Sequence, residues 1–440
     1  MVEQDENFSI REQGPELCDA GSRHWTGSVN ITKDKSMFFW YFESRNAPET
    51  DPVVLWMSGG PGATGEFGIF QDSGPCHVNE DGNSTTRQPF AWTDAANVLF
   101  IDQPVGVGFS TVASSDQTPV DLRAGARDLY AFLEIFTSSV FPDLANRPWH
   151  ISGESMGGHY TTGYVKYIVQ QQHEREGRGL RLDIKSIIAV DAYIDATRQS
   201  AGYYEFFCTG DQPRINETAC AHMASAVPHC EALGEKCRST YDVDICLLAA
   251  EVCDSTVGKY FLADVKPGGW DPYDARHPCT EPPLCGVANN ATEHFLNQGW
   301  VQERLGFAPF DFKLIDFDIN DAWTVDRHVF VPTTRELTWL LDNTDINIVF
   351  INGNEDIIIS TPGQIRMLNE QPWHGQAWFR AQGLQPWYYQ DGEVSSEGSI
   401  GGEWKGNRRL SLFTVNEAGH MAPYNQPEAV GAILKQWIRQ

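Results

Sequence analysis

Short, continuous apolar runs alternate along the chain with longer segments of helical periodicity. Runs such as VVLWM, NVLFI and IKSIIAV are too short for helices and are typical of strands buried on both faces of a sheet. Strands are predicted at 36–45, 51–57, 97–101, 149–152, 184–190, 346–353 and 410–415, and helices at 120–136, 159–174, 333–343 and 427–438. This alternation predicts an α/β fold with a mostly parallel central sheet and helices on both faces.

The pattern changes between residues 201 and 310. Eight of the ten cysteines lie in this stretch, and segments such as CLLAAEVC have short helical periodicity. Strands and helices alternate again after it. We therefore predict a disulfide-stapled, mainly helical insertion at 201–310, which divides a catalytic core into a first part at 1–200 and a second part at 311–440.

The charge balance excludes some partners. The 59 acidic residues outnumber the 32 basic ones, which gives a formal net charge of -27 and leaves no basic cluster. Such a chain repels nucleic acid and anionic membranes. No apolar run approaches the roughly 18 residues that a membrane span requires. We expect neither a nucleic-acid partner nor membrane insertion.

The cysteines and glycosylation sequons favour the secretory pathway. An even number of cysteines without C-x-x-C pairs is typical of disulfides rather than zinc. The chain also has five Asn-x-Ser/Thr sequons, at Asn7, Asn30, Asn83, Asn216 and Asn290. Its start has no apolar signal core, so we interpret it as a mature form with an added methionine. We expect a secreted protein, or one from a vacuole-like compartment.

The segment ISGESMGGHY predicts a catalytic serine. Ser155 lies between two glycines, with a predicted strand before it and a predicted helix after it, as in a nucleophile elbow. A serine needs a base and an orienting acid, which in this type of fold follow it on loops after late strands. Asp356 follows the strand at 346–353 and His420 follows the strand at 410–415. They are the candidate acid and base.

Other chemistries fit less well. HEREG at 173–177 lacks the second histidine of a zinc-protease helix, and no His and Cys residues have metal-ligand spacing. GVGFS is too short for a dinucleotide-binding fingerprint. We expect no metal and no cofactor.

Several motifs together resemble serine carboxypeptidases. WMSGGPGATG, FQDSGPC, VLFIDQPVGVGFS, GESMGGHY, NGNEDIII and EAGHMAP occur in the order and approximate spacing of that family, from about residue 27 to the C-terminus. The resemblance implies an α/β-hydrolase fold and the removal of single residues from the C-terminus of peptides.

The resemblance also implies residue roles. Ser155 is the nucleophile, His420 the base and Asp356 its orienting acid, while the backbone N–H groups of Gly60 and Met156 form the oxyanion hole. The family spacing implies the disulfides Cys208–Cys220, Cys230–Cys253, Cys237–Cys246 and Cys279–Cys285, which leaves Cys18 and Cys76 as the fifth pair.

The site that would bind the substrate's terminal carboxylate departs from the family pattern. The family has Asn before Gly-Gly-Pro-Gly, and Glu two residues before the Gly-Pro step. Here Ser58 precedes Gly59 and Asp72 replaces the glutamate, whereas Glu154 is retained. Acids can bind a carboxylate only when they hold protons, so this group of four residues implies binding at acidic pH. The family's Gly-Asn-Gly is replaced by DAY at 191–193.

We therefore predict a serine-type carboxypeptidase that acts through an acyl-enzyme on peptides with a free C-terminus at acidic pH, as a monomer or homodimer. A mostly protonated His420 could not act as a base there, so we expect its burial to outweigh the charge of Asp356. The alternatives are an acyltransferase or esterase with the same triad, which the serine at position 58 keeps open, and a non-catalytic binding protein on a hydrolase scaffold.

Overall fold

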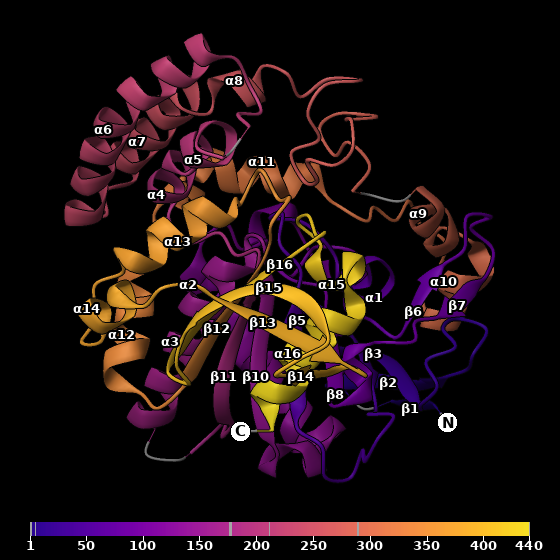
Figure 1. Ribbon diagram of the computed structural model, residues 1–440. Helices are drawn as coiled ribbons and strands as arrows, with labels where there is room; N and C mark the ends of the chain where they lie inside the picture. The colour runs from indigo at the N-terminus through magenta and orange to yellow at the C-terminus, as the bar shows by residue number, and fades with distance from the viewer. Residues whose placement is uncertain (1, 5, 176–177, 211, 288–289, 440) are drawn as a thin grey trace.

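A single large mixed sheet runs through the protein (Figure 1). The structure, a computed structural model, describes residues 2–4, 6–175, 178–210, 212–287 and 290–439. The strands of the large sheet follow the spatial order β1-β2-β3-β4-β8-β5-β10-β11-β12-β16-β15-β13-β14, and β9 pairs with β4. A separate small sheet contains β6 (Cys76–Val78) and β7 (Thr85–Arg87).

The centre of the large sheet is parallel and both of its sides are antiparallel. The parallel strands are β8 (Asn97–Ile101), β5 (Val53–Met57), β10 (Pro148–Glu154), β11 (Asp183–Val190), β12 (Asn347–Gly353) and β16 (Leu410–Val415). The antiparallel strands are β1 (Val2–Gln4), β2 (Phe8–Gln13), β3 (His24–Thr32), β4 (Lys35–Phe42), β9 (Thr111–Val112), β15 (Ser399–Gly406), β13 (Gln385–Gln390) and β14 (Glu393–Ser395). The predicted parallel arrangement therefore applies to the centre, where crossover helices connect the strands, whereas hairpins build the two sides.

Helices cover both faces of the sheet, and alternate strand residues contact different layers. On β5, Leu55 packs in one core with α2 (Leu122–Ile135), α3 (Gly157–Glu174) and α12 (Thr334–Asn343). The next residue, Trp56, packs in the other core with α1 (Gly65–Gln71) and α16 (Pro427–Ile438). Helix α2 begins at Leu122 because the side chain of Asp121 accepts a hydrogen bond from the N–H of Ala124 at 2.8 Å.

Helices fill most of the long connection between β11 and β12. They are α4 (Ala196–Ala201), α5 (Tyr203–Cys208), α6 (Glu217–Thr240), α7 (Val243–Thr256), α8 (Lys259–Leu262), α9 (Asn290–Leu296), α10 (Gly299–Leu305) and α11 (Phe317–Asp326). In Figure 1, α4 to α8 lie at the upper left, α11 at the top, and α9 and α10 at the right. Disulfides link Cys208–Cys220, Cys230–Cys253, Cys237–Cys246, Cys279–Cys285 and Cys18–Cys76, the same pairs that the family resemblance implies.

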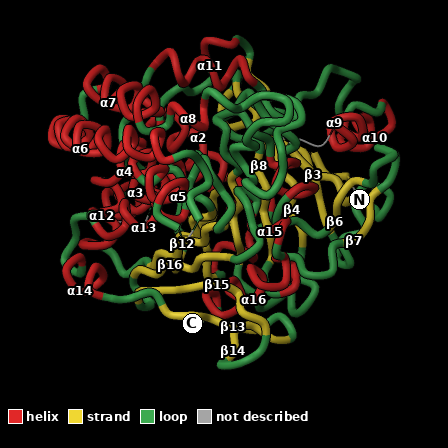
Figure 2. Tube along the Cα trace, turned by 45° about the horizontal axis from the view of Figure 1, so that its top comes forward, coloured by secondary structure: helices red, strands yellow, loops and turns green. Residues whose placement is uncertain are grey.

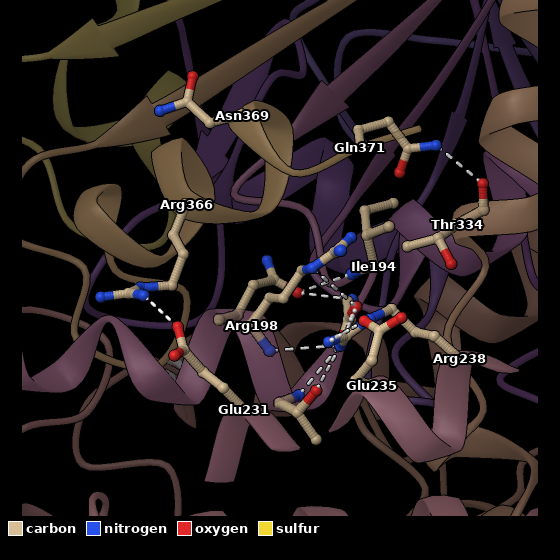
Figure 3. A network of polar contacts seen from close by, with 12 residues as sticks. Ile194, Arg198, Glu231, Glu235, Arg238, Thr334, Arg366, Asn369 and Gln371 are labelled. Atoms are coloured by element: carbon tan, nitrogen blue, oxygen red, sulfur yellow. Dashed lines mark hydrogen bonds and ion pairs between the residues drawn. The ribbon is translucent and has the colours of Figure 1, made fainter. Parts of the chain in front are cut away.

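Ion pairs attach this helical region to the rest of the molecule (Figure 3). Arg366 of α13 (Thr361–Asn369) contacts Glu231 of α6. Arg238 of α6 donates to Asp195, the residue that caps α4, at 3.0 Å. Arg238 and Asp195 are largely buried, so this pair holds α6 against α4, while the more exposed pair of Arg366 and Glu231 links α6 to α13.

The remaining elements are short. Helix α14 (Gln376–Ala381) precedes β13, and α15 (Ala422–Asn425) follows β16 (Figure 2). Single helical turns occupy Trp92–Asp94, Ser115–Gln117, Phe136–Val140, Pro142–Asn146 and His328–Phe330. Among the helices that the structure describes, none combines the length and the apolar character that crossing a bilayer would require.

Candidate active site

Ser155 lies on a sharp turn between β10 and α3. Its φ of 57° is in the left-handed region, which is strained for a residue other than glycine. Glycines flank the turn because it has no room for side chains: a Cβ on Gly153 would lie 2.7 Å from the carbonyl oxygen of Gly157. The turn therefore has the backbone of a nucleophile elbow at the carboxyl end of the central strands.

Asp356 and His420 lie on loops that follow neighbouring strands. Strands β12 and β16 pair in parallel, so both loops leave the same end of the sheet. Nδ1 of His420 lies 2.7 Å from Oδ2 of Asp356, and Oδ1 of Asp356 accepts from the N–H of Ile359 at 3.1 Å. With Nδ1 donating to the carboxylate, Nε2 is the nitrogen that can accept a proton.

The balance of effects on His420 differs from the expectation. Burial lowers the pKa of His420, but the charge and hydrogen bond of Asp356 and the charges of Glu154 and Asp271 together raise it above 6.5. The prediction that burial would outweigh the neighbouring charge is therefore wrong. The reason is that several carboxyl groups, and not Asp356 alone, surround the imidazole.

Ser155 and His420 line one cavity of about 90 Å³. Gly59 and Gly60 belong to its wall, and a Cβ on Gly59 would lie 2.7 Å from Cβ of Ser155 and 2.8 Å from the nitrogen of Met156. The glycine loop thus lies directly against the elbow, with Gly59 next to the backbone nitrogen of Met156. The apolar part of the wall consists of Ala63, Phe67, Leu284, Val287, Ile315 and Phe317.

Glu154 contributes a buried carboxyl group to this cavity. Its Oε2 has no hydrogen-bond partner among the described residues. Burial raises the pKa of Glu154 to about 7; the charge of Asp356 acts in the same direction and that of His420 opposes it. Below neutral pH this carboxyl group is therefore protonated and can donate a hydrogen bond into the cavity.

Ser58 and Asp72 are buried but are not among the described residues that line the cavity. The hydroxyl of Ser58 accepts a hydrogen bond from Nε1 of Trp56 at 3.2 Å. Asp72 caps the C-terminal end of α1, and neither of its carboxyl oxygens has a hydrogen-bond partner in the described part of the chain. Of the four residues expected to bind a carboxylate, the structure thus places Gly59 and Glu154 at the cavity and the other two outside its lining.

A loop of the helical insertion contacts the base directly. The N–H of His420 donates to the carbonyl oxygen of Tyr273 at 2.7 Å, and the two rings are 5.4 Å apart. A Cβ on Gly419 would lie 2.3 Å from that same oxygen. Tyr273, Asn320 and Phe317 also line the cavity, and no motif in the sequence pointed to them.

A second buried acid lies beside Asp356. One carboxyl oxygen of Asp191, one of Asp356 and one ring nitrogen of His420 all lie within 4.8 Å of one another. Asp191 directly follows β11, whose neighbours are β10 and β12. An acidic residue at the end of a central strand is the signal that identifies it, but from the sequence alone we interpret DAY only as a departure from the family's Gly-Asn-Gly.

The five sequon asparagines Asn7, Asn30, Asn83, Asn216 and Asn290 are all exposed. Asn216 also caps α6, because its Oδ1 accepts from the N–H of Ala219 at 2.9 Å. Glycosylation at these five exposed positions therefore stays a prediction.

Comparisons with known proteins agree with this geometry. The chain is 30% identical over 447 residues to carboxypeptidase Y from Schizosaccharomyces pombe, which covers 99% of this chain and 43% of that protein. It is 31% identical over 440 residues to carboxypeptidase Y homolog A from Leptosphaeria maculans, covering 98% of this chain and 77% of that one. The chain therefore spans less than half the length of the S. pombe relative.

The crystal structure of KEX1(DELTA)P, a prohormone-processing carboxypeptidase from Saccharomyces cerevisiae, has the same fold, with a TM-score of 0.80 at 20% identity over 97% of this chain and 95% of that one. The family model for serine carboxypeptidases matches residues 15–440, almost the whole chain. The protein belongs to the serine carboxypeptidase family, on an α/β-hydrolase fold.

Proposed function

We propose that the protein is a serine-type carboxypeptidase that releases C-terminal amino acids from peptides at acidic pH. One observation carries this proposal: a buried carboxyl group whose pKa is raised to about 7, that of Glu154, shares a cavity of about 90 Å³ with Ser155 and His420. A small cavity with a protonated acid next to the nucleophile suits the end of a peptide chain better than its middle.

The proposed reaction has two halves. His420 takes the proton of the Ser155 hydroxyl while Oγ of Ser155 attacks the last peptide carbonyl, and Asp356 stabilises the imidazolium that forms. The N–H groups of Gly60 and Met156 donate to the negative oxygen of the tetrahedral intermediate. The imidazolium protonates the leaving amine, and water then hydrolyses the acyl-enzyme with His420 again as the base.

The proposed role of Glu154 is to bind the terminal carboxylate. In its protonated form it donates a hydrogen bond to that carboxylate, with the backbone at Gly59 alongside. In its ionised form it would repel the substrate. Asp72 and Ser58 would support this end of the site indirectly, since Ser58 already accepts from Trp56.

Acyl transfer to an alcohol or amine, or ester hydrolysis, is the second candidate, and the serine at position 58 favours it. The triad and oxyanion hole would be the same, and only the acceptor of the acyl group would differ.

The disulfides and the exposed sequons support a location in the secretory pathway or in a vacuole. We further propose that the substrates are peptides and that the protein is a monomer or a homodimer. We also propose that the helical insertion spans residues 201–310.

The decisive experiment compares blocked dipeptides with their C-terminal amides and esters at several acidic pH values, and quantifies the released residue. We expect release from the free acids and little from the amides. Equal turnover of acids and amides would contradict carboxylate binding, and transfer to an added alcohol that exceeds hydrolysis would favour the second candidate. The variant Ser155→Ala is the control for background hydrolysis.

A further inference from the structure

Asp191 is a buried acid next to the triad that has no role in the proposed reaction. It is fully buried, and it adopts a φ of 40°, in the left-handed region. Its N–H donates to the carbonyl oxygen of Ile351 at 2.8 Å, and its Oδ1 accepts from the N–H of Gly353 at 2.7 Å. Its backbone and one carboxyl oxygen are thus fixed against β12, while Oδ2 receives no N–H or O–H from the described residues.

The carboxyl group of Asp191 faces that of Asp356 in a dry site. Oxygens of the two acids lie within 4.8 Å of each other, and neither side chain is exposed. Two carboxylates this close in a site of low dielectric cannot both be ionised, so the pair holds a proton over a wide pH range.

The hydrogen bonds around the pair indicate which acid holds this proton. Asp356 accepts from two donors, Nδ1 of His420 and the N–H of Ile359, and both favour its ionised form. Asp191 accepts from one donor, the N–H of Gly353. The charge therefore resides on Asp356 and the proton on Asp191.

We infer that Asp191 is protonated while the enzyme works and donates a hydrogen bond to Asp356, which makes it a positioning residue that adjusts the strength of the catalytic base. The inference rests on the proposed roles of Ser155, His420 and Asp356. Burial, and then the charge of Asp356, raise the pKa of Asp191 well above its usual range, which agrees with a proton held there.

Other titratable groups surround this pair. Glu154 lies at the end of β10 and His420 after β16, while Asp271 and Tyr273 belong to the insertion loop and Tyr203 to α5. Burial keeps Glu154 neutral at acidic pH, and both tyrosines are neutral there in any case. Asp356 and the buried Asp271 are then the acids that can stabilise the imidazolium of His420.

A neutral Asp191 has a specific effect on catalysis. Its hydrogen bond draws negative charge away from the His420 side of Asp356, so the imidazolium is stabilised less than it would be by an unassisted carboxylate. His420 then loses its proton at a lower pH and serves as a base in more acidic solution. Asp191 thereby offsets part of the rise in pKa that the surrounding acids impose on His420.

The test compares Asp191→Asn with Asp191→Leu. An asparagine can accept from Gly353 and donate to Asp356 as a protonated aspartate does, whereas a leucine, which has the same branching but is larger, can do neither. The readout is the rate at which a fluorophosphonate labels Ser155 between about pH 4 and pH 8, because this rate follows deprotonation of His420. Asp254→Asn is the matched control, since Asp254 is another buried acid, with its pKa raised to about 6, that hydrogen-bonds to Ser200.

The acidic limb is the range in which the labelling rate falls as the pH is lowered. We expect the midpoint pH of this limb to be the same in Asp191→Asn and Asp254→Asn as in the wild type. For Asp191→Leu it should move up by about 0.5 to 1 pH unit, so that labelling at acidic pH slows by roughly 3- to 10-fold while the rate at pH ~8 changes little. An infrared difference spectrum of the wild type minus Asp191→Asn should contain a protonated carboxyl band near neutral pH.

Three outcomes would overturn the inference. If Asp191→Asn shifts the limb to lower pH, Asp191 is ionised in the wild type. If both Asp191 variants move the limb equally, or if neither does, no hydrogen bond to Asp356 is involved. Labelling requires no peptide, so a failure of the proposed peptidase activity would leave this test valid and would be recognised separately.

Discussion

Glu154 and Ser155 are adjacent in the chain, and their side chains line the same cavity although one residue ends β10 and the other forms the turn after it. A buried acid next to a nucleophile would oppose the developing anion if it were ionised. Because burial raises the pKa of Glu154 to about 7, the acid is neutral at acidic pH and this conflict does not arise.

The first prediction concerns Glu154→Gln. In the wild type, KM for peptides should rise above pH ~7, where Glu154 ionises and repels the substrate carboxylate. Glutamine stays neutral, so KM should become nearly independent of pH across this range. Steady-state kinetics with a blocked dipeptide from about pH 5 to pH 8 measures the effect.

Glu154→Ala should raise KM for free-acid peptides by about 10- to 100-fold, while hydrolysis of a simple ester without a carboxylate changes much less. If peptides and esters were affected equally, Glu154 would have another role.

The second prediction concerns the acid of the triad. Asp356→Asn can keep the hydrogen bond to Ile359 but favours the wrong tautomer of His420, so kcat should fall by about 10⁴-fold with the fold intact. Glu355→Gln is the matched control, because Glu355 is the adjacent residue and pairs with Arg214 near the surface at 2.9 Å. Activity within a factor of ~10 of the wild type in Asp356→Asn would contradict the assignment.

The third prediction concerns the buried pair formed by Glu66 and Asp102. Burial raises the pKa of Glu66 well above its usual range, and it raises that of Asp102 to about 6. A carboxyl group whose pKa is higher in the folded state stabilises the fold at low pH, and this contribution is lost as the pH rises through the folded-state pKa. Glu66→Gln removes one of the two titrations.

We therefore expect Glu66→Gln to match the wild type in stability near pH 5 and to exceed it by about 1–3 kcal/mol near pH 8. Burial lowers the pKa of His24 and His150 to about 4, so these two histidines make the total stability rise with pH. The effect of Glu66 is therefore measured as the difference between the variant and the wild type. Thermal melting at both pH values, with exposed Glu251→Gln as control, measures this difference. A difference that does not grow with pH would exclude the pair as its source.

The fourth prediction concerns the disulfide between Cys230 and Cys253, which joins α6 to α7 across 23 residues of sequence. Replacing both cysteines by alanine should lower stability by about 3 kcal/mol, because the unfolded chain gains conformational freedom. Helices α6 and α7 should also become sensitive to limited proteolysis before the sheet does. A loss below ~1 kcal/mol would indicate that the second disulfide between these helices, Cys237–Cys246, already restricts the same segment of the unfolded chain.

The sequence predicted the central strands and covering helices well, because these segments have clear periodicity. The last helix, at 427–438, has the predicted bounds, and the helix predicted at 120–136 differs only at its ends, where Asp121 caps it. The N-terminal strands β1 to β3 were not predicted. They lie at the side of the sheet, and β2 and β3 are only partly buried there and have no continuous apolar run.

The residues of the site also differ in how well the sequence predicts them. Ser155, Asp356 and His420 follow strands with recognisable patterns, so their meeting could be inferred from chain order. Other residues that line the cavity, such as Tyr273 on an insertion loop and Phe317 at the start of α11, depend on how distant segments pack, and no local pattern encodes that. The pKa of His420 also depends on acids from several loops, which explains why its direction was predicted incorrectly.

The contact between the N–H of His420 and the carbonyl oxygen of Tyr273 has a consequence for how the enzyme can diverge. The loop that contributes to the shape of the substrate pocket also holds the catalytic base by its backbone. Substitutions that remodel this loop to accept new peptides would displace the base as well. We therefore expect substitutions in this loop that change peptide selectivity to change turnover as well.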